Sequence, residues 1–279
     1  MKTLRVSLLC LFLLQTALAW ALKPSREWAA TPDSVGLAYQ SLTLATPDHA
    51  QLATWVIEPT TAAPDQHTTL VLAYGDAGNM GNWVHQARAL ASAGYRVYLF
   101  DYRGFGHSSD FVINLNRLYY HEFALDLNTV LADAKRRYPR NRTGILGFSM
   151  GTIMSAEVAA AHRCDFFIAE GYVGNPQAIV ANVLKNKHKQ LSLPAEAARY
   201  ARLAPRINCP WLLIAGTQDV NTPLADSAAV VQAARRGQRR ELISFAGEHS
   251  AGFYTLSDKE FGDLYVAAIR RFLAVGGKG

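Results

Sequence analysis

The sequence has 279 residues, of which 50% are hydrophobic and 18% are charged, and its formal net charge is +6. This composition is that of an ordinary globular protein with an ample core, so it excludes a disordered or fibrous chain. Lysine and arginine are scattered along the chain without interleaved aromatic residues, so no nucleic-acid partner is expected.

The N-terminus has the layout of a secretory signal peptide. Lys2 and Arg5 precede an apolar run at residues 6–14, and residues 15–19 end in a small-x-small pattern. We predict a signal peptide at residues 1–19, with cleavage after Ala19 or Ala21, and export to the periplasm or the medium. An uncleaved anchor is the alternative, but the apolar run is short for a membrane span. No stable membrane insertion is expected after cleavage.

The sequence pattern of the rest of the chain changes at residue 69. Residues 20–40 carry few regular signals and are expected to wrap the surface, and residues 41–45 and 51–58 alternate in polarity like an antiparallel hairpin. After residue 69, continuous apolar segments alternate with helical ones, which indicates a parallel sheet covered on both faces. The expected strands are residues 69–74, 95–101, 143–148, 165–169, 211–215 and 241–246, and the main expected helices are residues 83–93, 118–138, 150–162 and 258–275.

One segment interrupts this alternation. Residues 172–208 are longer than a single crossover needs, with helical character at residues 178–184 and 195–203 and a basic stretch at residues 185–189. We predict a small cap over the carboxyl ends of the strands, where ligands bind in such sheets. An ordinary long crossover is the alternative. The domain prediction is therefore one α/β domain at residues 20–279, with a cap insertion at about residues 172–208.

A G-x-S-x-G pattern lies at the junction of an expected strand and helix. Gly147, Ser149 and Gly151 supply it. A strand that turns directly into a helix strains the serine backbone, and flanking glycines avoid the clashes that side chains would cause there. Such a turn lifts the serine hydroxyl above the sheet edge. Ser149 is the candidate nucleophile, although the motif alone also fits a serine that caps an ordinary helix.

A serine nucleophile needs a base and an orienting acid, each at the carboxyl end of a strand. Asp219 follows the expected strand at residues 211–215 within a glycine-containing turn, and is the candidate acid. Glu170, at the end of the preceding strand, is the rival acid. His249 follows the last expected strand and is the candidate base.

An oxyanion hole needs backbone amides close to the nucleophile. The amide of Met150 lies at the start of the expected helix, and the loop at residues 75–79 follows an expected strand. We expect the amides of Met150 and Asp76 to be the two donors, since removing one such donor costs a factor of about a hundred to a thousand in rate.

The order Ser149, Asp219, His249 resembles that of the α/β-hydrolase superfamily. Residues 74–79, YGDAGN, are similar to its His-Gly-x-x-Gly-Asn oxyanion segment, with Tyr74 in place of the usual histidine. Residues 101–108, DYRGFGHS, resemble its D-x-R-G-x-G-x-S stretch, but the common G-x-P that follows is missing. The resemblance covers about residues 40–275.

The resemblance implies a fold and a class of reaction. It implies an eight-stranded, mostly parallel sheet and hydrolysis of an ester, thioester or amide, closest to the small esterase-like and serine-aminopeptidase-like group. Aminopeptidase action, acyl transfer and a non-catalytic ligand-binding role remain alternatives. The basic residues Lys185, Lys187 and Lys189 favour neutral or acidic acyl substrates over peptide amines. No cofactor is implied, and no His or Cys spacing suggests a metal site.

The resemblance also implies a disulfide. Signal cleavage would remove Cys10 and leave Cys164 and Cys209. The family's sheet order sets the strands that follow these two cysteines side by side, about 4.8 Å apart. We therefore predict a Cys164–Cys209 bridge, with two buried thiols as the alternative.

Overall fold

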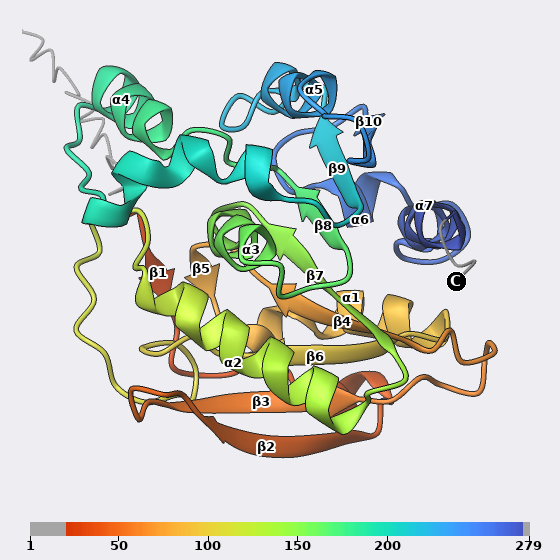
Figure 1. Cartoon of the computed structure of the whole chain (residues 1–279). Helices are drawn as coiled ribbons and strands as arrows, with labels where there is room; N and C mark the ends of the chain where they lie inside the picture. The colour runs from red at the N-terminus through yellow and green to blue at the C-terminus, as the bar shows by residue number, and fades with distance from the viewer. Residues whose placement is uncertain (1–20, 276–279) are drawn as a thin grey trace, which may run out of the picture.

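A computed structural model describes residues 21–275 (Figure 1). Its centre is an eight-stranded sheet in the order β10-β9-β8-β7-β4-β6-β3-β2. The strands β2 and β3 form an antiparallel hairpin, β3 pairs antiparallel with β6, and the remaining pairs are parallel. The bounds are β2 Tyr39–Ala45, β3 Gln51–Ile57, β4 Thr68–Ala73, β6 Arg96–Phe100, β7 Arg142–Phe148, β8 Phe167–Glu170, β9 Trp211–Gly216 and β10 Arg240–Phe245.

Helices cover both faces of this sheet. The helices α2 and α3 pack together on one face, while α1 and α7 pack on the other (Figure 1). Every residue of β4, β6, β8 and β9 is buried as a result, which explains their continuous apolar sequences. The bounds are α1 Val84–Ser92, α2 Glu122–Arg137, α3 Met150–Ala160, α4 Pro176–Lys187, α5 Leu224–Gln232, α6 Gly252–Thr255 and α7 Asp263–Ala274.

The predicted fold class is confirmed, with three local corrections. The last helix begins at Asp263 rather than near residue 258, because Gly262 has a φ of 71° and the Asp263 carboxylate accepts the amides of Asp258 and Lys259. The second helical segment between β8 and β9 is a 3-10 helix, Ala195–Arg202. The segment before β2 also differs from the prediction, because part of it pairs with another strand.

The expectation that residues 20–40 only wrap the surface is wrong for their first part. Leu22 is fully buried, and β1 (Lys23–Pro24) pairs in parallel with β5 (Ala77–Gly78). A two-residue strand is too short to show a periodic pattern, so the sequence did not reveal this pairing.

Cys164 and Cys209 lie immediately before the neighbouring strands β8 and β9, as the family's sheet order implied. Their sulfur atoms are 3.8 Å apart and both thiols are free, so no bond joins them here. A bond needs a sulfur separation of about 2.05 Å. The bridge stays a prediction.

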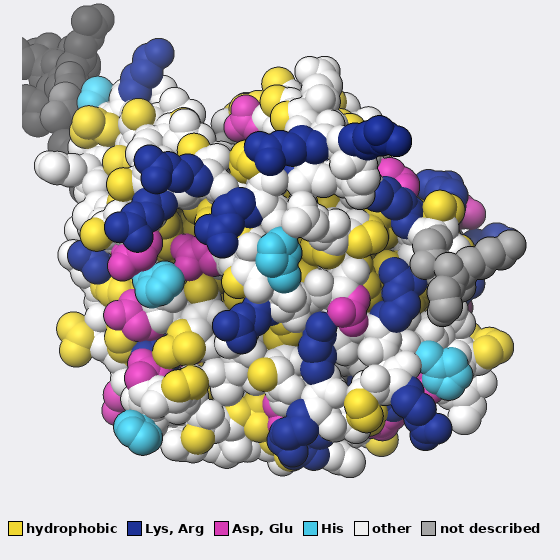
Figure 2. All heavy atoms as spheres, viewed as in Figure 1, with side chains coloured by type: hydrophobic (Ala, Val, Ile, Leu, Met, Phe, Trp, Pro, Cys, Tyr) yellow, Lys and Arg dark blue, Asp and Glu magenta, His cyan; other side chains and the backbone are white. Residues whose placement is uncertain are grey.

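Two features of the surface bear on partners. Lysine and arginine side chains are spread over the visible face among acidic and neutral ones (Figure 2). None of the helices between residues 21 and 275 is long and apolar enough to cross a membrane. The predicted signal peptide at residues 1–19 lies outside the described residues.

Candidate active site

Ser149 lies at a sharp turn between β7 and α3. Its φ of 50° and ψ of −122° are a strained conformation for a residue with a side chain. A Cβ added to Gly151 would lie 1.9 Å from the Ala73 carbonyl oxygen, and one added to Gly147 would lie 2.6 Å from Ser155 Oγ. Only glycine therefore lets α3 approach β4 and β7 closely enough to form this turn.

The imidazole of His249 joins Ser149 to Asp219. His249 Nε2 lies 2.7 Å from Ser149 Oγ, and His249 Nδ1 lies 2.7 Å from Asp219 Oδ2. The three residues follow β7, β9 and β10, which end at the same edge of the sheet. A hydrogen bond between Asp219 and Nδ1 leaves Nε2 available as the proton acceptor for the serine hydroxyl.

Asp219 is held by its own loop. Its Oδ1 accepts the amides of Asn221 and Thr222 at 2.8 and 2.9 Å, and its Oδ2 accepts the Thr222 hydroxyl at 2.6 Å. Burial raises the pKa of Asp219, but the hydrogen bonds from His249 and Thr222 outweigh burial, so the net pKa lies below its ordinary value. Asp219 is thus ionised at neutral pH and fixed toward the imidazole.

Two backbone segments can supply oxyanion donors. Met150 is the first residue of α3, where helical amides have no acceptor within the helix and the helix dipole is positive. Asp76 and Met150 line the same cavity as Ser149. A Cβ added to Gly75 would lie 3.4 Å from Ser149 Cβ, so the loop that carries Asp76 passes directly beside the serine. Tyr74, which replaces the family's histidine, is buried and donates its hydroxyl to Asp101 at 3.4 Å.

The serine opens into a cavity of about 250 Å³. The segment between β8 and β9, which was predicted to be a cap, contributes four apolar residues to its wall. The other walls come from the segment before β2, the loop before α2, and α3. The apolar lining residues are Ala21, Leu118, Met150, Ile153, Val173, Ile179, Val183 and Leu191.

Glu170, the rival acid, serves the loop that carries His249. Its Oε1 accepts the amide of Gly252 at 2.6 Å, and no hydrogen bond joins it to His249 within residues 21–275. Burial raises its pKa to about 7. Asp219 is therefore the carboxylate that contacts the imidazole. Glu170 instead anchors the backbone at Gly252, three residues after His249.

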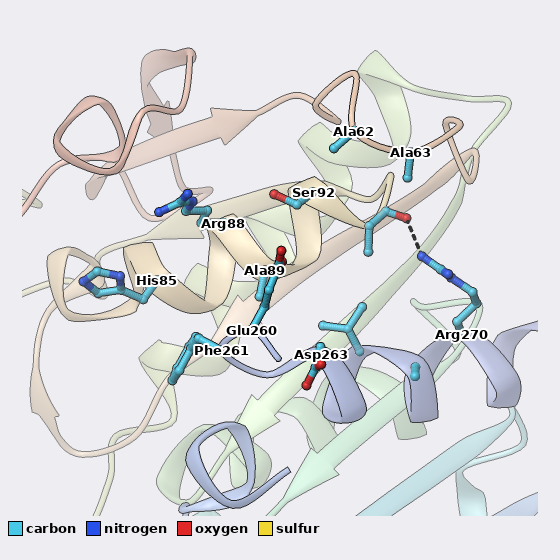
Figure 3. A pocket seen from close by; sticks show the side chains of 13 residues that line it. Ala62, Ala63, His85, Arg88, Ala89, Ser92, Glu260, Phe261, Asp263 and Arg270 are labelled. Atoms are coloured by element: carbon cyan, nitrogen blue, oxygen red, sulfur yellow. Dashed lines mark hydrogen bonds between the residues drawn. The ribbon is translucent and has the colours of Figure 1, made fainter. Parts of the chain in front are cut away.

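A larger cavity, of about 690 Å³, lies between α1 and α7 (Figure 3). It contains His85 and Ser92, but no hydrogen bond joins these two side chains in the described part of the chain. Five of its thirteen lining residues are alanine, and Arg270 donates to the Ala93 carbonyl at 3.2 Å. This cavity has the volume of a ligand site but lacks a nucleophile paired with a base. No group of three or more His, Cys, Asp or Glu that could bind a metal occurs among the described residues.

The structure brings all five predicted site residues together: Asp76, Ser149, Met150, Asp219 and His249. Sequence reasoning missed Thr222, whose hydroxyl contacts both Asp219 and His249, the latter at 3.2 Å. A hydroxyl residue three positions after the candidate acid was the available signal. It also missed Ala21 and Lys23, which line the cavity from a segment without any recognisable motif.

Comparisons with known proteins agree with this fold. A family model described as the alpha/beta hydrolase fold matches residues 68–169. An esterase from Pyrococcus furiosus has a similar structure, with a TM-score of 0.70 and 19% identity, over 90% of this chain and 98% of that one. A serine hydrolase homologue from Coxiella burnetii follows, with a TM-score of 0.59 and 20% identity, over 85% of this chain and 97% of that one.

A curated relative shares a shorter stretch. A monoacylglycerol lipase from Mycolicibacterium smegmatis is 36% identical over 87 residues, or 31% of this chain and 30% of the lipase. The chain thus spans about a third of the length of the curated relatives it matches. The family model matches a little over a third of the chain, and the solved structures share its architecture, so the chain has the α/β-hydrolase fold.

Proposed function

We propose that this protein is a serine hydrolase that cleaves a carboxylic ester or thioester through an acyl-enzyme on Ser149. The observation that carries the proposal is the hydrogen-bonded chain from Ser149 Oγ through His249 to Asp219, with both contacts at 2.7 Å. This chain ends in a cavity, so a carbonyl carbon can reach the serine oxygen.

The proposed reaction has two steps. His249 Nε2 accepts the hydroxyl proton as Ser149 Oγ attacks the carbonyl carbon, and the amides of Met150 and Asp76 stabilise the oxyanion. The imidazolium, held by Asp219, then protonates the leaving alcohol or thiol. In the second step His249 activates a water molecule, which releases the acid and regenerates Ser149.

The cavity favours a small acyl group. Its volume of about 250 Å³ lies below the roughly 300–1,000 Å³ that is common for drug-sized ligands. Its wall is largely aliphatic, which suits an acyl chain. We therefore expect esters of short acyl chains to be better substrates than those of long chains.

Two other activities use the same triad. An aminopeptidase needs acidic groups that hold the substrate's ammonium, and among the described residues the cavity wall offers the single acid Asp76, beside the cation Lys23. An acyltransferase would use an alcohol in place of water in the second step. A non-catalytic binding role is the remaining alternative, and it is disfavoured because all three residues of the triad are present and in contact.

The test is Ser149→Ala, compared with Ser155→Ala. Ser155 is a buried serine of the same helix whose hydroxyl bonds to the Gly151 carbonyl. Ser149→Ala should lower turnover of nitrophenyl esters by a factor on the order of 10⁶ and abolish labelling by a fluorophosphonate, while Ser155→Ala keeps both. Full turnover by Ser149→Ala would refute the assignment. A series of nitrophenyl esters and aminoacyl amides would then separate esterase from peptidase.

We also propose that the protein is exported and that its signal peptide is removed. The support is the layout of residues 1–19 in the sequence. The mass of the protein recovered from the periplasm or medium would give the cleavage position, and a cytoplasmic protein of full mass would refute the proposal.

A further inference from the structure

The segment at residues 21–28, which we call the N-terminal segment, lies against the loop that carries Asp76. The amide of Lys23 donates to the Asp76 carbonyl at 2.8 Å, and the amide of Ser25 donates to the Gly78 carbonyl at 3.0 Å. These bonds make the β1–β5 pair. The carbonyl of Asp76 is thereby fixed one residue away from the Gly75 backbone that passes beside Ser149.

Asn79 adds a second set of bonds between the same two segments. Its side chain is fully buried, and Nδ2 donates to the carbonyls of Ser25 and Glu27 at 3.1 and 2.7 Å. Its Oδ1 accepts the amide of Gly81 at 3.0 Å. One side chain therefore links the end of the oxyanion loop to the N-terminal segment.

The N-terminal segment is itself anchored to the body of the protein. Trp28 donates from Nε1 to Asp101 Oδ2 at 2.8 Å, and the other oxygen of Asp101 accepts the Met80 amide at 2.8 Å. The amide of Gly106 donates to the Ser25 carbonyl at 2.8 Å. At the other end, the amides of Ala21 and Leu22 donate to the carbonyl of Leu115. The N-terminal segment is thus held at several points by the chain between β6 and α2.

We propose that the N-terminal segment is a positioning element of the oxyanion hole. A donor such as the Asp76 amide stabilises a transition state only when it is held in place before the reaction, and a displacement of about 1 Å can cost on the order of a hundredfold in rate. In this chain the loop of Asp76 is held from outside by β1 and by the contacts of Asn79. This inference rests on the proposed function, since it assigns a role within the same reaction.

The test is Ser25→Pro with Ser25→Ala as its control. Ser25→Pro removes the amide that donates to Gly78 and keeps the carbonyl, while Ser25→Ala keeps both backbone groups. For each variant, kcat and KM for a nitrophenyl ester are divided by the number of active sites, counted by complete fluorophosphonate labelling. Ser25→Pro should lower kcat per active site by about ten- to a hundredfold, with little change in KM. A purely structural role would lower only the number of active sites.

A second measurement tests the proposal even if Ser25→Pro does not fold. In the unaltered protein, hydrogen exchange at the amides of Lys23 and Ser25 should be as slow as in the edge strands of the main sheet. Fast exchange at these amides would overturn the proposal, as would equal kcat per active site in folded Ser25→Pro and Ser25→Ala. If Ser149→Ala remained active, the proposed function would fail instead, so the two failures are distinguishable.

Discussion

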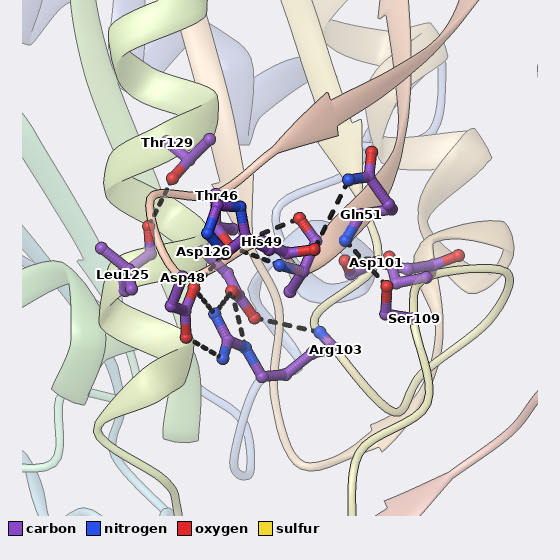
Figure 4. A network of polar contacts seen from close by, with 12 residues as sticks. Thr46, Asp48, His49, Gln51, Asp101, Arg103, Ser109, Leu125, Asp126 and Thr129 are labelled. Carbon is purple, nitrogen blue, oxygen red and sulfur yellow. Dashed lines mark hydrogen bonds and ion pairs between the residues drawn. The ribbon is translucent and has the colours of Figure 1, made fainter.

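Two clusters of partly buried charged residues lie in this protein, and they are built differently. One is the chain of Ser149, His249 and Asp219. The other surrounds Arg103, which follows β6 and contacts Asp48 of the β2–β3 hairpin and Asp126 of α2 (Figure 4).

In the Arg103 cluster, the charged groups hydrogen-bond to one another. The guanidinium donates to Asp48 at 2.6 and 3.0 Å and to Asp126 at 2.7 and 2.9 Å, and the Arg103 amide donates to Asp126 at 3.0 Å. The Arg103 guanidinium beside Asp48 holds the pKa of that carboxyl well below its usual range. None of the three residues lines the cavity that holds Ser149.

In the triad, the hydrogen-bonding capacity of Asp219 is filled, but that of Ser149 is not. Asp219 has four hydrogen bonds, from His249, Asn221 and twice from Thr222, whereas Ser149 Oγ contacts His249 and faces the cavity. A cluster whose groups all bond to each other stabilises the fold. A cluster that leaves one reactive atom toward a cavity can do chemistry.

Replacing an aspartate by asparagine should have very different effects in the two clusters, and the largest effect on kcat is expected at Asp219. In Asp219→Asn the amide no longer holds the imidazole in the tautomer that accepts the serine proton, so kcat should fall by about 10⁴-fold. The melting temperature should change little, because Asn can keep the bonds to the loop amides. Steady-state kinetics and thermal unfolding measure the two effects. Asp126→Asn is the matched control, and it should lose stability while kcat per active site is retained.

Arg103→Met should show the opposite pattern. It leaves Asp126, whose side chain is fully buried, without its cation, and breaking a buried pair in this way typically costs about 3–5 kcal/mol. Urea unfolding measures the loss of free energy of unfolding. The surviving folded protein should keep its kcat per fluorophosphonate-labelled site. A large fall in that kcat would show that the two clusters are coupled and that the comparison is wrong.

The sequence predicted the parts of the site that chain order determines. The triad could be placed because each member follows an apolar strand, and parallel strands bring their carboxyl ends to one edge of a sheet. The Met150 and Asp76 positions followed from the same rule. The sheet order that the family resemblance implies also placed Cys164 beside Cys209.

The missed parts depend on contacts that have no local pattern. The pairing of Lys23 with the loop of Asp76 uses backbone groups, which any residue provides, so no residue type marks it. Thr222 was hidden for a similar reason, because a hydroxyl in a turn usually bonds to its own backbone. The distinct role of Glu170 also needed the structure, since only there does its carboxylate meet the amide of Gly252 rather than the imidazole.

The smallest effect is expected at Glu170. Its carboxylate bonds to the loop that carries His249 and not to the imidazole, so it tests whether a second carboxylate takes part in the triad. Burial raises its pKa to about 7 from the usual 4.5, with Gly252, Tyr265, His249 and Asp219 as neighbours. Below pH 4.5 the carboxyl is protonated whether the chain is folded or unfolded, so its full stabilising contribution is present. As the pH rises toward and through 7, the folded protein must ionise a buried group that the unfolded chain has already ionised. About 3 kcal/mol of stability is therefore lost over this range.

Glu170→Gln should flatten that part of the profile, because the amide oxygen still accepts the Gly252 amide but cannot ionise. The free energy of unfolding, measured in urea at pH 5 and pH 8, should differ less in Glu170→Gln than in the unaltered protein. The kcat of Glu170→Gln should fall far less than that of Asp219→Asn, because Glu170 holds the loop of His249 and not its ring. Equal losses of kcat in the two variants would make Glu170 a second partner of the imidazole, and the cluster at the strand ends would then contain two working carboxylates rather than one.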